Sequence, residues 1–325
     1  MVQFSILLAM SEAARVVALL TALDVEHCAI RPHFNEMQVR KHPKGTIFEV
    51  GSVPGLATRI ALATTGNGNL KAAIVAEQAI AEFDPAALLF AGIAGALADD
   101  LALGDVVVAT RTYGFHGGRE DDDGLRARPR SWEAAHELEQ LARHVARTQS
   151  WTRFLPGRKR RCPPAVHFRP IVAGEILLNS RNSASASQIQ RHYNDAAAIE
   201  MESAGAAQAA HLARVPMITI RGVSDSASGE KDATDRSGWR QSAAENAAAF
   251  ACGLIAVFDI TLQGTDLAEV RSGVAAAQAA GQELPEDELH LLGESGGRDR
   301  VVMRAEVHGP GQVNQAGRDQ VVISR

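Results

Sequence analysis

Residues 196–229 read AAAIEMESAGAAQAAHLARVPMITIRGVSDSASG. Within this stretch the apolar residues 197–199 favour a short strand, and the Ala-rich residues 203–213 have the composition of a helix. Pro216 ends that helix, because proline disfavours helical backbone in the residue before it. Residues 217–220 form a second apolar run, which is typical of a buried strand. The stretch therefore predicts strand, helix and strand in succession, as in α/β folds.

Polar side chains follow both predicted strands. Those after the first are Glu200, Met201 and Glu202, and those after the second are Arg221, Ser224 and Asp225. In open α/β sheets, ligands bind beyond the carboxyl ends of the strands. These residues are therefore candidates for a functional site. The alternative is that the acidic side chains only cap helices and solvate loops.

The E-M-E segment and the S-D pair about two dozen residues later resemble motifs of the nucleoside phosphorylase and nucleosidase superfamily, which includes methylthioadenosine-type nucleosidases. The resemblance covers about residues 4–258. It implies an α/β fold of three layers, with a central mixed, twisted sheet flanked by helices. It also implies an N-ribosyl hydrolase that releases an adenine-type base from a purine nucleoside or nucleotide.

The resemblance assigns roles to these residues. It implies that Glu202 holds the ribose hydroxyls, that Met201 packs under the sugar and that Asp225 protonates the purine base. Ser224 and Arg221 would orient Asp225, and Glu200 is counted with the substrate-binding residues. Cleavage of an N-glycosidic bond passes through an oxocarbenium-like ribose. A carboxylate that accepts hydrogen bonds from both hydroxyls places negative charge beside that developing cation.

The N-terminal residues are expected to supply the group that activates water. Residues 4–9 (FSILLA) predict a first strand, and Ser11 is expected to open a helix that runs to about residue 23. Hydrolytic members of the family carry a Glu in the turn between such elements. The nearest acid here is Glu12, one position before the usual one, and Glu175 is a second, less favoured candidate. Alternatively, Glu12 only favours the positive end of the helix.

Residues 92–95 (GIAG) are expected to form a turn after the buried strand 88–91. The resemblance makes Gly92 and Ile93 candidate substrate contacts. Phosphorolytic members of the family bind free phosphate through a hydroxyl in this turn, whereas an isoleucine side chain cannot donate a hydrogen bond. The sequence therefore favours water as the nucleophile. A phosphate-dependent phosphorylase and a nucleotide sensor without turnover are the alternatives.

Residues 171–180 (IVAGEILLNS) resemble the base-binding segment of the family. There the backbone that follows a Gly-acidic pair reads the edge of adenine, which makes Glu175 a candidate contact. Leu177 stands where the family has an aromatic residue that stacks on the base. A purine can still be held through main-chain groups and apolar contact.

The other predicted elements are strands at 46–50, 59–65 and 105–109 and helices at 70–83, 131–147 and 239–258. The turn at residues 66–68 (GNG) precedes the first of these helices. Such a turn can hold an anion on its backbone N–H groups, or it can simply be a tight connection.

The composition limits the possible functions. A chain of 325 residues, 46% hydrophobic, can hold one large α/β domain and roughly 60 further residues. The net charge of −5 argues against general nucleic-acid binding, and no apolar run reaches the roughly 18 residues of a membrane span. Three scattered cysteines predict neither a metal cluster nor a disulfide framework. We expect a cytoplasmic homo-oligomer without a cofactor.

Five cations lie within nine residues of this acidic chain. They are Arg153, Arg158, Lys159, Arg160 and Arg161. Such a run is usually a solvated loop, and the alternative is a receptor for the 5′-phosphates of a nucleotide.

The composition changes after residue 262. We expect a catalytic domain at 1–262, a linker at 263–300 that is first helical and then acidic, and a β-prone interaction motif at 301–325. The last segment alternates valines with Asn, Gln and Gly, and it resembles the short amyloid-like signalling motifs of bacterial effector proteins. That resemblance implies a protein partner and a role in bacterial defence. The alternative is an ordinary hairpin.

Overall fold

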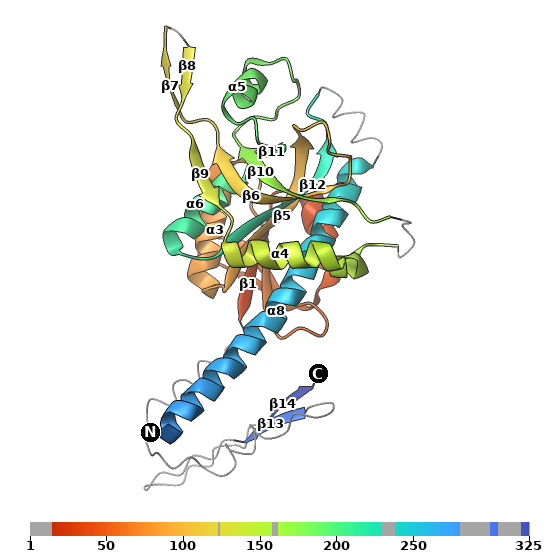
Figure 1. Cartoon of the computed structure of the whole chain (residues 1–325), viewed down its shortest axis with the longest axis vertical. Coiled ribbons are helices and arrows are strands. Elements are labelled where there is room, and N and C mark those ends of the chain that lie inside the picture. Colours follow the sequence, from red (N-terminus) through yellow and green to blue (C-terminus); the bar gives the residue numbers. More distant parts are fainter. Residues whose placement is uncertain are drawn as a thin grey trace. The chain divides into compact units, whose positions relative to one another are not determined.

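The computed structural model describes residues 15–122, 124–157, 162–228, 238–279, 300–304 and 320–324. Its contacts divide the chain into two units, residues 1–261 and residues 262–325. The first unit contains the central mixed sheet (Figure 1).

A ten-stranded mixed sheet forms the centre of the first unit. In spatial order its strands are β11 (Ala198–Glu200), β10 (Val166–Ala173), β6 (Val106–Gly114), β12 (Met217–Asp225), β5 (Ala87–Ala96), β1 (Val16–Thr21), β4 (Arg59–Thr64), β3 (Ile47–Ser52) and β2 (Asn35–Lys41), with β9 (Arg130–Glu133) paired to β6. β12 is parallel to β5 and antiparallel to β6. β11 pairs with both β10 and β5, so that β5, β12, β6, β10 and β11 close into a ring.

Helices cover the sheet on both faces. α3 (Asn69–Phe83) and α6 (Ser203–Ala213) share one apolar cluster with the inward side chains of β1 and β5. The described part of α8 (Trp239–Ala279) packs so closely on β12 that a Cβ at Gly222 would lie 2.0 Å from the backbone oxygen of Ala243. β5 and β12 are buried along their whole lengths, which requires cover on both faces. This three-layer arrangement confirms the predicted fold class.

Shorter elements complete the first unit. They are α2 (Asp24–Ile30), η1 (Arg31–His33), β7 (Gly118–Asp121), β8 (Gly124–Ala127), α4 (His136–Thr148), η2 (Ser150–Phe154) and α5 (Ala184–His192). β7 and β8 pair with each other as a separate antiparallel ladder.

The predicted start of the chain was wrong in part. Residues 16–21, expected to be helical, form the buried strand β1, and the helix that follows, α2, begins at Asp24. The apolar residues of this run fit a helical period as well as a strand, and burial on both faces decides for the strand. The strand predicted at residues 4–9 lies outside the described residues.

Three other boundaries differ from the sequence predictions. Residues 92–95 belong to β5 and form no turn, and residues 131–133 belong to β9, so that α4 begins only at His136. The helix expected at 239–258 and the helical first part of the expected linker belong to one continuous helix, α8. By contrast, α6 covers residues 203–213 as predicted.

The second unit contains the last part of α8 and one antiparallel strand pair. β13 (Arg300–Arg304) pairs with β14 (Gln320–Ser324), with Val302 opposite Val322. In the described part of the chain, no helix combines the length and the apolar character that a bilayer crossing requires.

Candidate active site

The ring of strands brings carboxylates from distant parts of the sequence to its edge. Asp225 ends β12, Glu202 follows β11 and Glu175 follows β10. Glu26, in α2, joins this set because α2 follows β1, the neighbour of β5. The structure thus gathers most of the predicted residues and adds one that the sequence analysis missed.

Glu26 is a buried carboxylate held by three backbone N–H groups. Its Oε2 accepts from Ala22 N at 2.7 Å and from Leu23 N at 2.9 Å, and its Oε1 accepts from Ile93 N at 2.8 Å. Burial raises the pKa of Glu26, although the nearby Arg221 guanidinium opposes that rise. A carboxylate that is fixed in place and has a raised pKa is suited to take a proton near neutral pH.

Gly92 lies where the site admits no side chain. A Cβ on this residue would lie 2.1 Å from Arg221 Nη1 and 2.5 Å from Glu26 Oε1. The guanidinium and the carboxylate therefore meet directly above the backbone of β5. Gly92 and Ile93, expected to form a turn, lie in this strand, and the Ile93 amide holds Glu26. Their contact with the substrate stays a prediction.

Glu200 points inward, although it was predicted to contact the substrate. Its carboxylate accepts from Glu202 N, from Ser203 N and Oγ at the start of α6, and from Arg221 Nη2. With so many donors from the chain itself, Glu200 anchors Arg221 and the first turn of α6.

Arg221 is fully buried and connects Glu200 with Glu26. Its guanidinium carbon lies 4.4 Å from the centre of the Phe90 ring. Among the described residues, no group accepts from its Nε or Nη1, and Nη1 lies above Gly92 on the side of Glu26. Arg221 was expected to orient Asp225, whereas the structure pairs it with Glu200.

Glu202 stands at the N-terminus of α6, with 7% of its surface exposed. Its Oε1 accepts from Gly68 N at 3.2 Å, and its Oε2 accepts from Met201 N at 3.3 Å. Burial and the negative charge of Glu200 raise the pKa of Glu202 to about 7, against the opposing effect of Arg221. Met201 beside it is half-buried.

Asp225 is buried at the end of β12 and held from two sides. Ser224 Oγ lies 2.9 Å from its Oδ2 and can donate to it, and Ala227 N donates to its Oδ1 at 3.0 Å. A Cβ at Gly95 would lie 2.8 Å from that Oδ1. The backbone of β5 thus passes directly beneath the carboxylate, and the contact of Ser224 agrees with its predicted orienting role.

The predicted base-binding segment, residues 171–180, covers the end of β10 and the residues that follow it. Glu175 Oε1 accepts from Asn69 N at 3.2 Å, next to the amide of Gly68 that binds Glu202. The N-terminus of α3, considered above as an anion site, is therefore occupied by two carboxylates of the chain itself. Leu177 is 59% exposed on the same segment.

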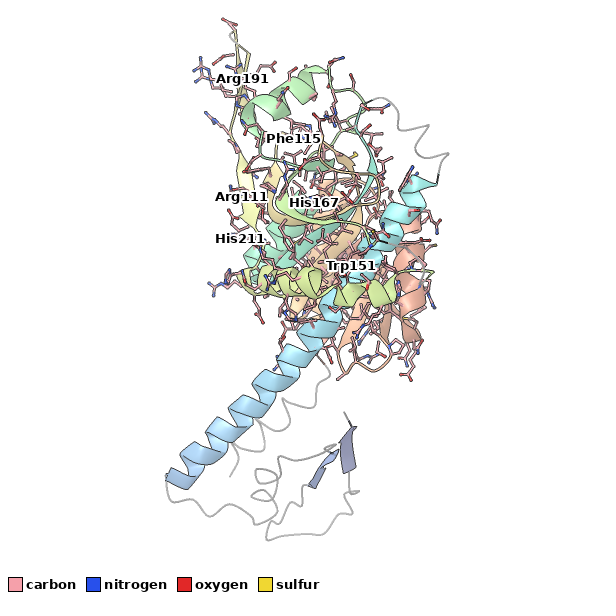
Figure 2. All side chains as sticks on the ribbon, turned by 45° about the vertical axis from the view of Figure 1, so that its right-hand side comes forward. Arg111, Phe115, Trp151, His167, Arg191 and His211 are labelled. Carbon is pink, nitrogen blue, oxygen red and sulfur yellow. The ribbon has the colours of Figure 1, made fainter. Side chains whose placement is uncertain are left out.

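Two ring side chains, Phe115 and His116, pack against the base-binding segment. Phe115, labelled in Figure 2, packs against Gly174 so closely that a Cβ there would lie 2.1 Å from its ring. The ring of Phe115 stacks on His116, whose Nδ1 accepts from Glu175 N at 3.1 Å. The backbone of the segment is thus fixed before any ligand binds.

Some predicted site residues lie outside the described residues. These are Glu12 and the cations Arg158, Lys159, Arg160 and Arg161. The sequence analysis missed Glu26. A signal was present, because residues 22–26 (ALDVE) place this acid shortly after an apolar run, as was expected of Glu12 after residues 4–9. In the described part of the chain, no three His, Cys, Asp or Glu side chains gather in a way that would hold a metal ion.

Residues 5–256 match the family model of the Phosphorylase superfamily. The 5′-methylthioadenosine/S-adenosylhomocysteine nucleosidase of Maridesulfovibrio salexigens is 28% identical over 55% of this chain and 72% of its own length. The nucleosidase of the same name from Chromohalobacter salexigens is 26% identical over 67% of this chain and 87% of its own length.

Solved structures show the same fold. The corresponding nucleosidase of Neisseria meningitidis, in complex with methylthio-immucillin-A, is 26% identical with a TM-score of 0.63, over 74% of this chain and 98% of that one. The futalosine hydrolase of Helicobacter pylori has a TM-score of 0.64 at 21% identity, over 74% of this chain and 97% of that one. The latter likeness concerns the fold alone.

Proposed function

The chain belongs to the phosphorylase superfamily, and on that premise we propose that it hydrolyses the N-glycosidic bond of a purine nucleoside or nucleotide and releases an adenine-type base. One observation carries the proposal: Glu26 lies close enough to Glu202 to raise its pKa, and Glu26 and Asp225 lie over Gly92 and Gly95 of the same strand, β5. The relatives named as methylthioadenosine nucleosidases support the same reaction class.

Glu26 is the group that we assign to the nucleophile. It takes a proton from a water molecule as the water oxygen bonds to the anomeric carbon of the ribose. Three backbone N–H groups fix its position, and the positive charge of the Arg221 guanidinium lies beside it. The apolar side chain of Ile93 offers no donor to phosphate, which supports water over phosphate as the nucleophile.

The other two carboxyl groups act on the sugar and the base. Glu202 accepts hydrogen bonds from the 2′ and 3′ hydroxyls and stabilises the oxocarbenium-like ribose. As the bond between the sugar and the base breaks, its electron pair moves to the purine, and Asp225 donates a proton to that base. Ser224 holds Asp225 in position for this transfer.

A substrate panel tests the proposal. Purified protein is incubated with adenosine, methylthioadenosine, AMP or ATP, with and without added phosphate, and free adenine is measured by chromatography. We expect release from at least one of them without phosphate. Release only with phosphate would instead identify a phosphorylase, and binding without release would identify a nucleotide sensor.

The pKa of Glu202 gives a prediction for stability. This pKa rises from 4.5 in the unfolded chain to about 7 in the folded protein. The free energy of unfolding is therefore highest below pH 4.5 and falls as the pH rises toward 7. Glu202→Gln removes that pH-dependent loss, so its stability relative to the wild type is expected to be about 3 kcal/mol higher near pH 8 than near pH 4, at about 1.36 kcal/mol for each pKa unit of the shift. Urea unfolding of both proteins near pH 4 and pH 8 measures it. An equal difference at both pH values would contradict the assigned pKa.

We also propose that residues 301–325 recruit a protein partner by strand addition and thereby connect the enzyme to bacterial defence signalling. The valine-rich composition, which favours strands, supports this proposal, whereas the β13–β14 pair also fits the alternative of an ordinary hairpin. The partner would be a separately encoded, nucleotide-binding oligomeric ATPase with a similar motif, which clusters the enzyme.

A peptide of residues 301–325 is expected to form thioflavin-positive fibrils with cross-β diffraction. Val302→Pro combined with Val322→Pro should abolish them, because proline cannot donate to a strand ladder. Deletion after Asp299 should leave the first unit folded and active. If the peptide stays monomeric and the deletion variant unfolds, the segment is a structural hairpin of the enzyme and the recruitment proposal is wrong.

A further inference from the structure

Asn69, the first residue of α3, forms three hydrogen bonds with two other parts of the site, α6 and the base-binding segment. Its side-chain Nδ2 donates to the carbonyl oxygen of Gly174 at 2.9 Å, and its Oδ1 accepts from Gly205 N at 2.9 Å. Its backbone N–H donates to Glu175 Oε1 at 3.2 Å. One residue thus joins α3, α6 and the base-binding segment.

These contacts meet at the residues that we assign to substrate binding. Gly205 lies in the first turn of α6, three residues after Glu202, and Gly174 lies in the base-binding segment, directly after β10. Gly68, directly before Asn69, donates its N–H to Glu202 Oε1. The same turn therefore holds the carboxylate assigned to the sugar and the backbone assigned to the base.

We infer that Asn69 is a positioning residue that sets the spacing between the sugar-binding and base-binding halves of the site. This inference rests on the proposed function. Neither the substrate nor the reacting atoms need to touch Asn69, because it acts through Glu202 and through Gly174 of the base-binding segment.

The carboxamide is the chemical group that this position needs. It offers a donor and an acceptor on one rigid plane, here used for Gly174 and Gly205 at once. A carboxylate keeps the acceptor and loses the donor, and a methyl group has neither. Close packing fixes the geometry further, since a Cβ at Gly205 would lie 1.9 Å from the backbone oxygen of Asn69.

Asn69→Ala is expected to raise KM by about tenfold while kcat stays within about threefold, because the two halves lose their mutual alignment but keep the reacting groups. Asn246→Ala is the matched control. Asn246 donates its Nδ2 to the carbonyl oxygen of Gly104 at 2.7 Å, a bond of the same kind in α8. The control should lower the melting temperature and leave KM unchanged.

Asn69→Asp gives a second readout, which also serves if the alanine variant fails to fold. It keeps the acceptor for Gly205 and adds a negative charge next to the turn that binds Glu202. The groups already facing Glu202 are the Gly68 amide on α3, Glu200 on β11, Arg221 on β12 and Glu26 on α2, with Glu175 at the adjacent amide. The added negative charge should raise the pKa of Glu202 further. The acid limb of the plot of kcat/KM against pH should therefore shift to higher pH by about half a unit.

Failure of this inference differs from failure of the proposed function. If wild-type protein releases no base, the proposed function fails, and adenosine affinity measured by calorimetry replaces KM in the comparison of Asn69→Ala with the wild type. If wild-type protein is active but Asn69→Ala keeps its KM and Asn69→Asp keeps its acid limb, Asn69 has no positioning role and the inference is overturned.

Discussion

Glu26→Gln is expected to lower kcat by about 10³-fold, the scale of a lost general base. The amide is nearly the same size as the carboxylate, so the fold should persist and substrate affinity should change by only a few fold. Removing a buried acid with a raised pKa relieves a cost near neutral pH, whereas the amide nitrogen cannot accept from the backbone N–H groups that hold Glu26, so the two effects on stability oppose each other. Single-turnover kinetics with calorimetry separates the chemical step from binding.

The matched control is Glu12→Gln. Glu12 was the acid that the sequence analysis placed in this role, and the two variants make the assignments exclusive. If Glu26 activates water, Glu12→Gln keeps nearly full kcat. Loss of activity in the Glu12 variant, with normal turnover in the Glu26 variant, would return the role to Glu12.

Asp225→Asn is expected to lower the rate of purine release by about 10²–10⁴-fold, because it removes the proton that the departing base needs. The amide oxygen can still accept from Ala227 N, so binding should stay within a few fold. The loss should depend on the leaving group. The 4-nitrophenolate group of a 4-nitrophenyl riboside leaves without being protonated. Hydrolysis of this riboside by the variant should therefore fall far less than hydrolysis of adenosine.

Ser224→Ala separates the orienting contact from the proton donor. Ser224 contacts Asp225 Oδ2, and its loss should reduce turnover by about tenfold, the scale of one hydrogen bond to a charged group.

Equal losses for adenosine and the nitrophenyl riboside in Asp225→Asn would show that Asp225 does not protonate the base.

Local sequence patterns were sufficient for the elements around the site. The apolar run at residues 217–220 and the Ala-rich residues 203–213 are a strand and a helix as predicted. The positions of Glu202 and Asp225 follow directly, because a residue next to a strand end has a fixed place at the edge of the sheet. Such signals depend on near neighbours in the chain, which the sequence contains.

The function of each acid could not be read in the same way. Glu200 and Glu202 are two residues apart, yet Glu200 turns inward to Arg221 while Glu202 meets Gly68 from α3. Glu26 is distinguished by its burial and by the Ile93 amide, which comes from a strand 67 residues further along the chain. Sequence periodicity at residues 16–23 even favoured a helix there.

The sequence by itself determined the α/β fold class, the strand and helix that present the E-M-E segment, and the place of Asp225 at a strand end. Only the tertiary structure decided that Glu26 meets Arg221 above Gly92, that Glu200 is an anchor and that Asn69 joins two halves of the site. The physical reason is that the burial of a carboxylate, its pKa and its donors are set by groups that folding brings from distant strands.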